Sequence, residues 1–183
     1  MTEKLNIGII LGSTREGRVS EQVGEWAKQI ADQRNDATYE IVDIAEYNLP
    51  FLGTTDGTEP GLAKWTEKIN SLDAFVFVVA EYNHGLPAAL KNALDVAAPT
   101  LWHNKAAGIM SYGSTGGARA AEHLRGILGE LFVADVRTHP TFSLFTDFEN
   151  FSTFKPADLH FENMTSLFDQ VNSWGKALKA IRN

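Results

Sequence analysis

The chain has 183 residues, of which 44% are hydrophobic and 21% are charged, a composition that suits one domain with a substantial core and argues against wholesale disorder. The formal net charge of −7 disfavours nucleic acid and anionic membrane as partners, because both reward clustered lysine and arginine. The sequence contains no cysteine, which excludes disulfides, thiolate catalysis and cysteine-ligated metal clusters, so any redox chemistry has to come from a cofactor.

The sequence carries no sign of a targeting or membrane segment. Residues 1–4 lead straight into an apolar run, without the charged-then-apolar layout of a signal peptide. No uninterrupted apolar stretch approaches the ~20 residues that a membrane-spanning helix needs. We therefore expect a cytoplasmic protein with no membrane insertion.

Short apolar runs alternate with helical patterns along the chain. The runs LNIGIIL and AFVFVVA are almost entirely hydrophobic, which is typical of strands covered on both faces of a parallel sheet. Between such runs, apolar residues recur at the three- and four-residue spacing of helices. We predict strands over 5–11, 38–44, 74–80, 106–112 and 133–139, and helices over 19–34, 62–72, 86–97, 118–131 and 161–181.

This alternation predicts an α/β fold of three layers, αβα, because right-handed crossovers place helices on both faces of a parallel sheet. Five strands match the doubly wound, flavodoxin-like order 2-1-3-4-5, in which a ligand binds beyond the carboxyl ends of the strands. Other doubly wound orders remain open on the pattern alone. We find no internal repeat and no linker-like stretch, so residues 1–183 are expected to form a single domain.

The first predicted strand is followed by the segment GSTREGRVS at residues 12–20. Its glycines allow exposed backbone N–H groups, and the start of the following helix attracts anions. Ser13 and Ser20 offer hydroxyl groups, while Arg15 and Arg18 offer forked, permanently charged donors. The segment fits neither the dinucleotide nor the nucleoside-triphosphate loop pattern. It suits a terminal phosphate, and the alternative is a turn whose hydroxyls cap the helix and whose arginines are solvated.

The central strand is followed by EYNHGLP at residues 81–87. Its aromatic, amide and backbone groups suit a flat heterocycle, and Pro87 favours an abrupt helix start. Tyr82 either stacks on such a ring or packs beneath the loop. His84 is placed either to contact a second substrate or to face solvent.

The fourth strand is followed by SYGSTGGAR at residues 111–119, with three glycines within five positions. These glycines indicate either close approach of a ligand or a turn that requires positive φ. Because all strands of a parallel sheet end at one edge, the three loops are expected to converge there.

Together, the segments GSTREGRVS, EYNHGLPAALKNALD and SYGSTGGARAAEHLR resemble the NADPH-dependent FMN reductase family, including its quinone-reductase and azoreductase-like members. The resemblance spans about residues 5–140. It implies non-covalent FMN, with Ser13, Arg15 and Ser20 at the phosphate and the second and third loops along the isoalloxazine ring. The candidate cofactor-binding residues are Ser13, Arg15, Arg18, Val19, Ser20, Glu81, Tyr82, Asn83, His84, Tyr112, Gly113, Ser114 and Gly116.

The resemblance further implies an oxidoreductase that takes electrons from NADPH or NADH and passes them from reduced FMN to a small-molecule acceptor. A quinone, free flavin, azo compound or metal oxyanion would serve, and the sequence does not choose among them. The flavin supplies the chemistry, so no catalytic side chain is named. A backbone N–H near Asn83 or Gly116 is a candidate to stabilise the reduced ring.

Two functions of another class compete with this reading. A non-catalytic flavodoxin-type electron carrier or a flavin-sensing module would use the same cofactor without turnover. A receiver domain is a weaker alternative, because the loop after the first strand lacks clustered carboxylates.

Three further patterns carry expectations. The five histidines show no ligand spacing, so no metal site is expected. Phenylalanine recurs at every third position from Phe142 to Phe154, which indicates a hydrophobic wall or lid beside the flavin, a subunit contact, or a cover over the end of the sheet. Nine of the twelve residues of 86–97 are apolar or proline, which predicts a homodimer or homotetramer with this helix at the interface.

Overall fold

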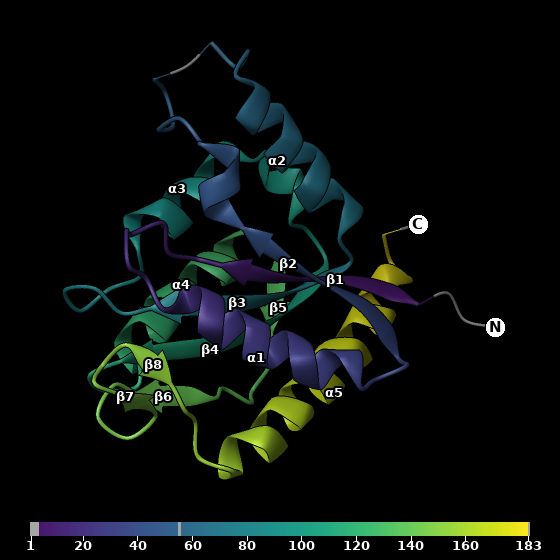
Figure 1. Cartoon of the computed structure of the whole chain (residues 1–183). Coiled ribbons are helices and arrows are strands. Elements are labelled where there is room, and N and C mark those ends of the chain that lie inside the picture. The colour runs from purple at the N-terminus through teal and green to yellow at the C-terminus, as the bar shows by residue number, and fades with distance from the viewer. Residues whose placement is uncertain (1–3, 55, 183) are drawn as a thin grey trace.

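The computed structural model describes residues 4–54 and 56–182, which form a parallel sheet between two layers of helices (Figure 1). The order β2-β1-β3-β4-β5 confirms the predicted topology. The strands are β1 (Leu5–Leu11), β2 (Ala37–Asp43), β3 (Ala74–Ala80), β4 (Lys105–Gly113), β5 (Val133–Asp135) and β6 (Thr141–Ser143).

Five helices cover the sheet. In Figure 1, α1 and α5 lie over one face, and α2, α3 and α4 pack on the other. Apart from the fifth strand, the predicted elements differ from the observed ones only at their ends. No helix within residues 4–54 and 56–182 is both long and apolar enough to span a membrane. The helices are α1 (Ser20–Asp32), α2 (Pro60–Ser71), α3 (Ala88–Val96), α4 (Ala118–Glu130) and α5 (Leu159–Lys179), with short 3-10 turns η1 (Ile44–Tyr47) and η2 (Pro99–Leu101).

The central strand β3 explains why its sequence is continuously hydrophobic. Every residue of β3 is buried, and successive side chains point to opposite faces. Val76 and Val78 pack with α1 and α5, whereas Phe75 and Phe77 pack with the opposite helices. Both faces of the strand therefore belong to the core.

The predicted fifth strand over 133–139 is wrong in its second half. β5 ends at Asp135, and the chain returns to the sheet only as β6, which pairs with the last residues of β4. Between them, Thr138 leaves the ladder, and its N–H donates to Gln170 of α5 at 3.0 Å. Pro140 has no N–H to donate, so it contributes only its carbonyl, which accepts from Ser111 N at 3.0 Å. The fifth position of the sheet is thus shared by two short strands.

The phenylalanine series divides into covering and exposed residues. Phe142 and Phe148 are buried, and Phe154 packs against them. Phe145 and Phe151 are exposed. The series belongs partly to an antiparallel hairpin of β7 (Phe148–Glu149) and β8 (Thr153–Phe154), so the interpretation as a cover over the sheet holds for three of its members.

Helix α3 is more polar on its outer face than the composition of 86–97 indicates. Ala93 is fully buried, and its carbonyl accepts a hydrogen bond from Trp65 Nε1 at 2.8 Å. On the outer side, Lys91 and Asp95 form an ion pair at 2.6 Å. Ala93 therefore belongs to the core and does not add to the outer apolar surface that the composition of 86–97 indicated.

Candidate functional site

The loops after β1, β3 and β4 converge at the carboxyl edge of the sheet, where they enclose a cleft of about 630 Å³. A fourth segment, which follows β6, completes the lining. The residues that line the cleft are Arg15, Gly17, Val19, Glu81, Tyr82, Asn83, Tyr112, Gly113, Leu144, Phe151 and Ser152.

The structure brings part of the predicted set directly onto this cleft. Arg15, Val19, Glu81, Tyr82, Asn83, Tyr112 and Gly113 line it. The remaining predicted residues, which do not line it, are Ser13, Arg18, Ser20, His84, Ser114 and Gly116.

The two arginines of the first loop have different environments. Arg18 is largely buried, donates to the carbonyl of Ser13 at 2.8 Å, and pairs with Asp43 at 2.5 Å and Glu21 at 2.7 Å. Arg15 is exposed at the cleft and has no acidic partner in the described chain. Its guanidinium carbon lies 5.5 Å from the centroid of the Tyr82 ring. Arg18 therefore holds the loop in place, while Arg15 remains free for a ligand.

Buried hydroxyl groups gather beneath the same loop. Ser13 Oγ lies 2.7 Å from the Tyr82 hydroxyl, so these two groups satisfy each other. The hydroxyls of Ser20 and Tyr112 are also buried, yet neither finds a hydrogen-bond partner among the described residues. Burial, and next the neighbouring Tyr82, raise the pKa of Tyr112, so its phenol stays protonated. Buried polar groups are almost always paired, so this cluster of hydroxyls is a polar spot in the floor beneath the first loop.

The start of α1 lies at this point and is not capped by a side chain. Val19 occupies the N-cap position, where it has no oxygen to accept from the first-turn N–H groups. Ser20 is the first helical residue. The positive end of the helix dipole therefore faces the loop that carries Arg15, an arrangement suited to an anion.

The loop after β3 is a tight turn closed by two backbone hydrogen bonds, Tyr82 N to Gly85 O at 3.0 Å and Gly85 N to Tyr82 O at 3.1 Å. Its central residues, Asn83 and His84, both have positive φ, 49° and 73°, as a type I′ turn requires. Both are exposed, and their backbone N–H groups donate to no acceptor in the described chain. The turn thus presents free backbone donors at the edge of the cleft.

Glu81 anchors this turn to α4. Its carboxylate pairs with the Arg119 guanidinium and accepts from the N–H groups of Arg119 at 3.1 Å and Ala120 at 3.4 Å. Burial alone would raise the pKa of Glu81, but the hydrogen bonds from Arg119 and Ala120 hold that pKa below its usual value. Arg119 also contacts His84 Nδ1 at 3.0 Å. The charges of Glu81 and Arg119 are therefore paired with each other.

The glycines after β4 are required by the backbone conformation of their own turn. Gly116 and Gly117 have φ of +70° and +74°, and a Cβ at Gly117 would lie 2.7 Å from Tyr112 N. The N–H of Gly116 donates to the Gly113 carbonyl at 3.1 Å. Of the two backbone candidates, the loop at Asn83 therefore keeps free N–H groups, while Gly116 does not.

Four residues line the cleft but were not among the predicted cofactor-binding residues, namely Gly17, Leu144, Phe151 and Ser152. For the segment that holds Phe151, the signal was the regular phenylalanine spacing, and a wall beside the ligand was one of its three interpretations. The structure connects this segment with α1 through Gln22, which bonds Ser152 and Phe154. Within the described residues, no three His, Asp or Glu side chains gather as a metal site would require.

A second cavity, of about 460 Å³, lies between the first loop, η1 and the start of α3. It is lined by small, apolar and amide side chains, with no charged residue, and includes Phe51, Ala88 and Asn92. It lacks the arginine and the unpaired buried hydroxyls of the cleft.

Comparison with known proteins gives a consistent result. A family model described as NADPH-dependent FMN reductase matches residues 5–147. An NAD(P)H-dependent FMN reductase of Schizosaccharomyces pombe is 33% identical over 144 residues, 74% of this chain and 72% of the relative. An NAD(P)H:quinone oxidoreductase of Solanum tuberosum is 36% identical over 131 residues, 67% of this chain and 66% of the relative.

Among solved structures, the flavoenzyme NAD(P)H:(acceptor) oxidoreductase FerB from Paracoccus denitrificans superposes with a TM-score of 0.75 at 19% identity. The match covers 94% of this chain and 98% of that protein. The two proteins share the fold.

Proposed function

The chain belongs to the NADPH-dependent FMN reductase family, and on that premise we propose that it binds FMN non-covalently in the cleft at the carboxyl edge of the sheet. It is an NAD(P)H-dependent oxidoreductase of the FMN reductase and quinone reductase type. Membership of this family favours a reductase with turnover over a carrier or a flavin-sensing module.

The observation that carries the FMN proposal is the set of unused polar groups at one end of the cleft. Among the described residues, Arg15 has no acidic partner, the hydroxyls of Ser20 and Tyr112 have no hydrogen-bond partner, and α1 begins without a side-chain cap. A phosphate monoester fits these donors, because its oxygens accept several charge-assisted hydrogen bonds at once. The residues present therefore fit the group.

When bound, the flavin would accept hydride from NADPH or NADH and would pass electrons to a small-molecule acceptor. The chain's own residues bind and orient it. Arg15, Ser20 and the first turn of α1 hold the phosphate, and Tyr82 offers its ring to the cofactor. The N–H groups of Asn83 and His84 offer hydrogen bonds to developing negative charge at the heterocycle.

A direct test compares FMN with riboflavin, which lacks the phosphate. Arg15→Ala is expected to weaken FMN binding by roughly 1.5–3 kcal/mol, the scale of a hydrogen bond to a charged group, and to leave riboflavin binding unchanged. Ser20→Ala is expected to weaken FMN binding without lowering the free energy of unfolding of the apoprotein, because it removes a buried hydroxyl that has no partner. Flavin fluorescence titration and denaturant unfolding measure the two quantities.

Arg137→Ala is the matched control, since Arg137 is also an exposed arginine and does not line the cleft. It is expected to bind FMN as the unmodified protein does. Equal affinity of the unmodified protein for FMN and riboflavin would contradict the proposal.

We also propose that the chain assembles as a homodimer or homotetramer with α3 at the contact. Beside the exposed Ala88 of α3, Phe51 and Leu52 are 67% and 65% exposed. Asn92 of α3 holds them there, accepting from Leu52 N at 3.1 Å and donating to Pro50 O at 2.9 Å. An apolar patch of this kind is covered when a second copy packs on it.

A further inference from the structure

The segment 144–154, which we call the aromatic arm, carries an exposed pair of rings. Phe145 and Phe151 are 67% and 60% exposed, and their ring centroids lie 5.6 Å apart at an interplanar angle of 88°. Single exposed apolar residues are ordinary on a protein surface, but two large rings in edge-to-face contact form a continuous apolar surface. The fold does not bury this surface.

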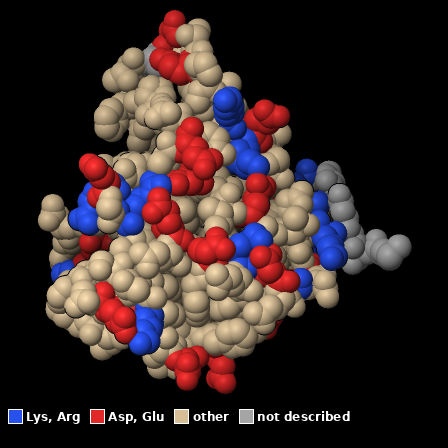
Figure 2. Space-filling view, in the orientation of Figure 1, with Lys and Arg blue, Asp and Glu red and all other residues tan. Residues whose placement is uncertain are grey.

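The arm belongs to the cleft. Leu144, Phe151 and Ser152 line it together with Arg15 and Tyr82, so an apolar wall stands beside the polar groups that fit the phosphate. Figure 2 shows that the surface over the β6–β8 region of Figure 1 is mostly free of charged groups. Lys155, next to the arm, is paired with Glu149 at 2.6 Å.

The arm is held in an unfavourable backbone conformation. Asn150 and Phe151 both have positive φ, 50° and 57°, and a bulky side chain rarely adopts such a value. The Ser152 N–H donates to the Glu149 carbonyl at 3.1 Å, so Asn150 and Phe151 are the central residues of a tight turn between the hairpin strands. The turn between β7 and β8 thus presents the Phe151 ring at the cleft against its local preference.

Two sets of contacts hold the arm in place. The Gln22 side chain of α1 donates to Ser152 O at 2.8 Å and accepts from Phe154 N at 2.9 Å, so it pairs with the arm as a neighbouring strand would. At the base, the buried Asp147 carboxylate accepts from Ser143 N at 2.9 Å and from Ala157 N at 3.2 Å. Both ends of the arm are therefore tied to the body of the protein.

From this geometry we propose that Phe145 and Phe151 form the docking surface for the electron acceptor, and that this surface selects a flat, uncharged acceptor of the quinone class. Gln22 holds the arm, and thereby the docking surface, in position. The inference rests on the proposed function, because the acceptor has to reach a flavin held in the same cleft. Aromatic rings bind flat π-systems by stacked or edge-to-face contact. A small anionic acceptor gains nothing from such a wall. Phe145 lies within the residues that match the family model, and Phe151 lies just beyond them.

The test measures KM and kcat for NAD(P)H oxidation with menadione and with ferricyanide as acceptors. Phe151→Ala is expected to raise the KM for menadione about tenfold and to leave the KM for ferricyanide unchanged. Gln22→Met, which removes both hydrogen bonds to the arm, is expected to raise the KM for menadione by a smaller factor and to leave the ferricyanide kinetics unchanged.

Phe132→Ala is a closely matched control. Phe132 is 68% exposed and has φ of 55°, so it shares the exposure and backbone conformation of Phe151 but does not line the cleft. It is expected to leave the kinetics with both acceptors unchanged.

Three results would overturn the inference. The KM for menadione could stay the same in Phe151→Ala, both acceptors could be affected equally with loss of FMN, or the substitution could change the mass of the assembly. The last two would assign the arm to the cofactor or to a second copy of the chain. If the unmodified protein took up no FMN and oxidised no NAD(P)H, the proposed function itself would fail and this inference with it.

Discussion

At the scale of single residues, His139 makes stability depend on pH. Its Nε2 lies 2.8 Å from Ser111 Oγ, which donates to the Gly116 carbonyl at 2.6 Å, so the imidazole supports the glycine turn beside the cleft. Burial, and next the charge of Arg125, lower the pKa of His139 from 6.5 to about 4. As pH falls from 6.5 towards 4, His139 is protonated in the unfolded chain but stays neutral in the folded protein. This difference favours the unfolded chain, so the free energy of unfolding decreases.

From the difference between the pKa of His139 in the unfolded and folded states, we expect the free energy of unfolding to decrease by up to roughly 3 kcal/mol as pH falls from 6.5 to 4. Above pH 6.5 we expect no decrease from this group. His139→Gln should flatten that part of the profile, measured by denaturant unfolding at several pH values. His123→Gln, at an exposed position on α4, is the control and should follow the unmodified protein. An unchanged profile in His139→Gln would show that other groups cause the acid loss.

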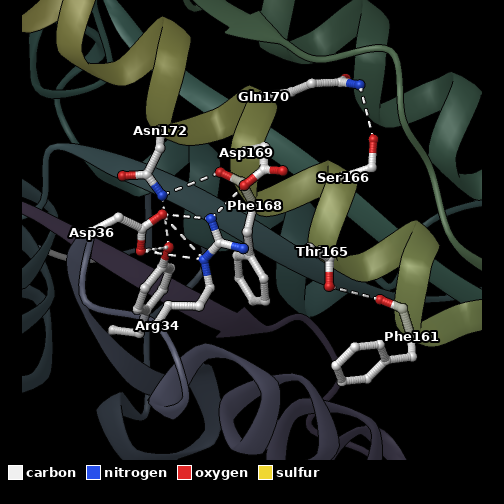
Figure 3. A network of polar contacts seen from close by, with 10 residues as sticks. Arg34, Asp36, Phe161, Thr165, Ser166, Phe168, Asp169, Gln170 and Asn172 are labelled. Atoms are coloured by element: carbon white, nitrogen blue, oxygen red, sulfur yellow. Dashed lines mark hydrogen bonds and ion pairs between the residues drawn. The ribbon is translucent and has the colours of Figure 1, made fainter.

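At the scale of elements, a polar network joins β2 and the end of α1 to α5 (Figure 3). The Tyr39 hydroxyl donates to Asp36 at 3.1 Å and accepts from the buried Asn172 amide at 2.6 Å. Arg34 pairs with Asp36 and with Asp169 of α5, both at 2.5 Å. The Tyr39 hydroxyl, at the centre of this network, thus links α5 to β2, the edge strand of the sheet.

Tyr39→Phe is expected to lower the free energy of unfolding at pH 7 by about 1–2 kcal/mol, because two hydrogen bonds are lost and the Asn172 amide keeps only the Phe168 carbonyl, at 3.2 Å. Burial, and next Asp36, raise the pKa of Tyr39 to about 12. Its neutral form therefore stabilises the fold below pH 10, and this contribution is lost as pH rises through 12.

In Tyr39→Phe, the decrease in the free energy of unfolding between pH 9 and 12 should be smaller than in the unmodified protein, as measured by denaturant unfolding. The matched control is Thr165→Val on α5, which removes one hydrogen bond within the helix, to Phe161 O at 3.0 Å. It is expected to change stability by less than about 0.5 kcal/mol. A larger effect of Thr165→Val than of Tyr39→Phe would refute the role assigned to the network.

At the scale of the whole molecule, the proposed assembly has a simple readout. Light scattering at micromolar concentration should give two or four times the 20.1 kDa chain mass. Phe51→Glu should shift the mass towards the monomer, because it places a charge in the patch beside α3. Ile181→Glu is the control, since Ile181 is 64% exposed on the last turn of the chain. A monomer mass for the unmodified protein with FMN present would contradict the assembly.

The sequence by itself determined the order of the elements and the place where the site had to form. The continuous run of β3 predicts burial on both faces, and alternation with helices predicts a parallel sheet. Since parallel strands end at one edge, the loops beginning at Gly12, Glu81 and Gly113 had to meet there. The family resemblance, carried by those same loops, was confirmed by the comparisons.

Only the tertiary structure decided which groups at that edge remain free. Arg15 and Arg18 look alike in the sequence, but Arg18 is held by Asp43, 25 residues further along the chain. Ser13 and Ser20 look alike as well, but Ser13 is paired with Tyr82, 69 positions away. The aromatic arm reaches the cleft through Gln22, 130 residues before Ser152. Local patterns encode helices and strands, whereas the pairing of a polar group depends on partners that only the folded chain brings within hydrogen-bond distance.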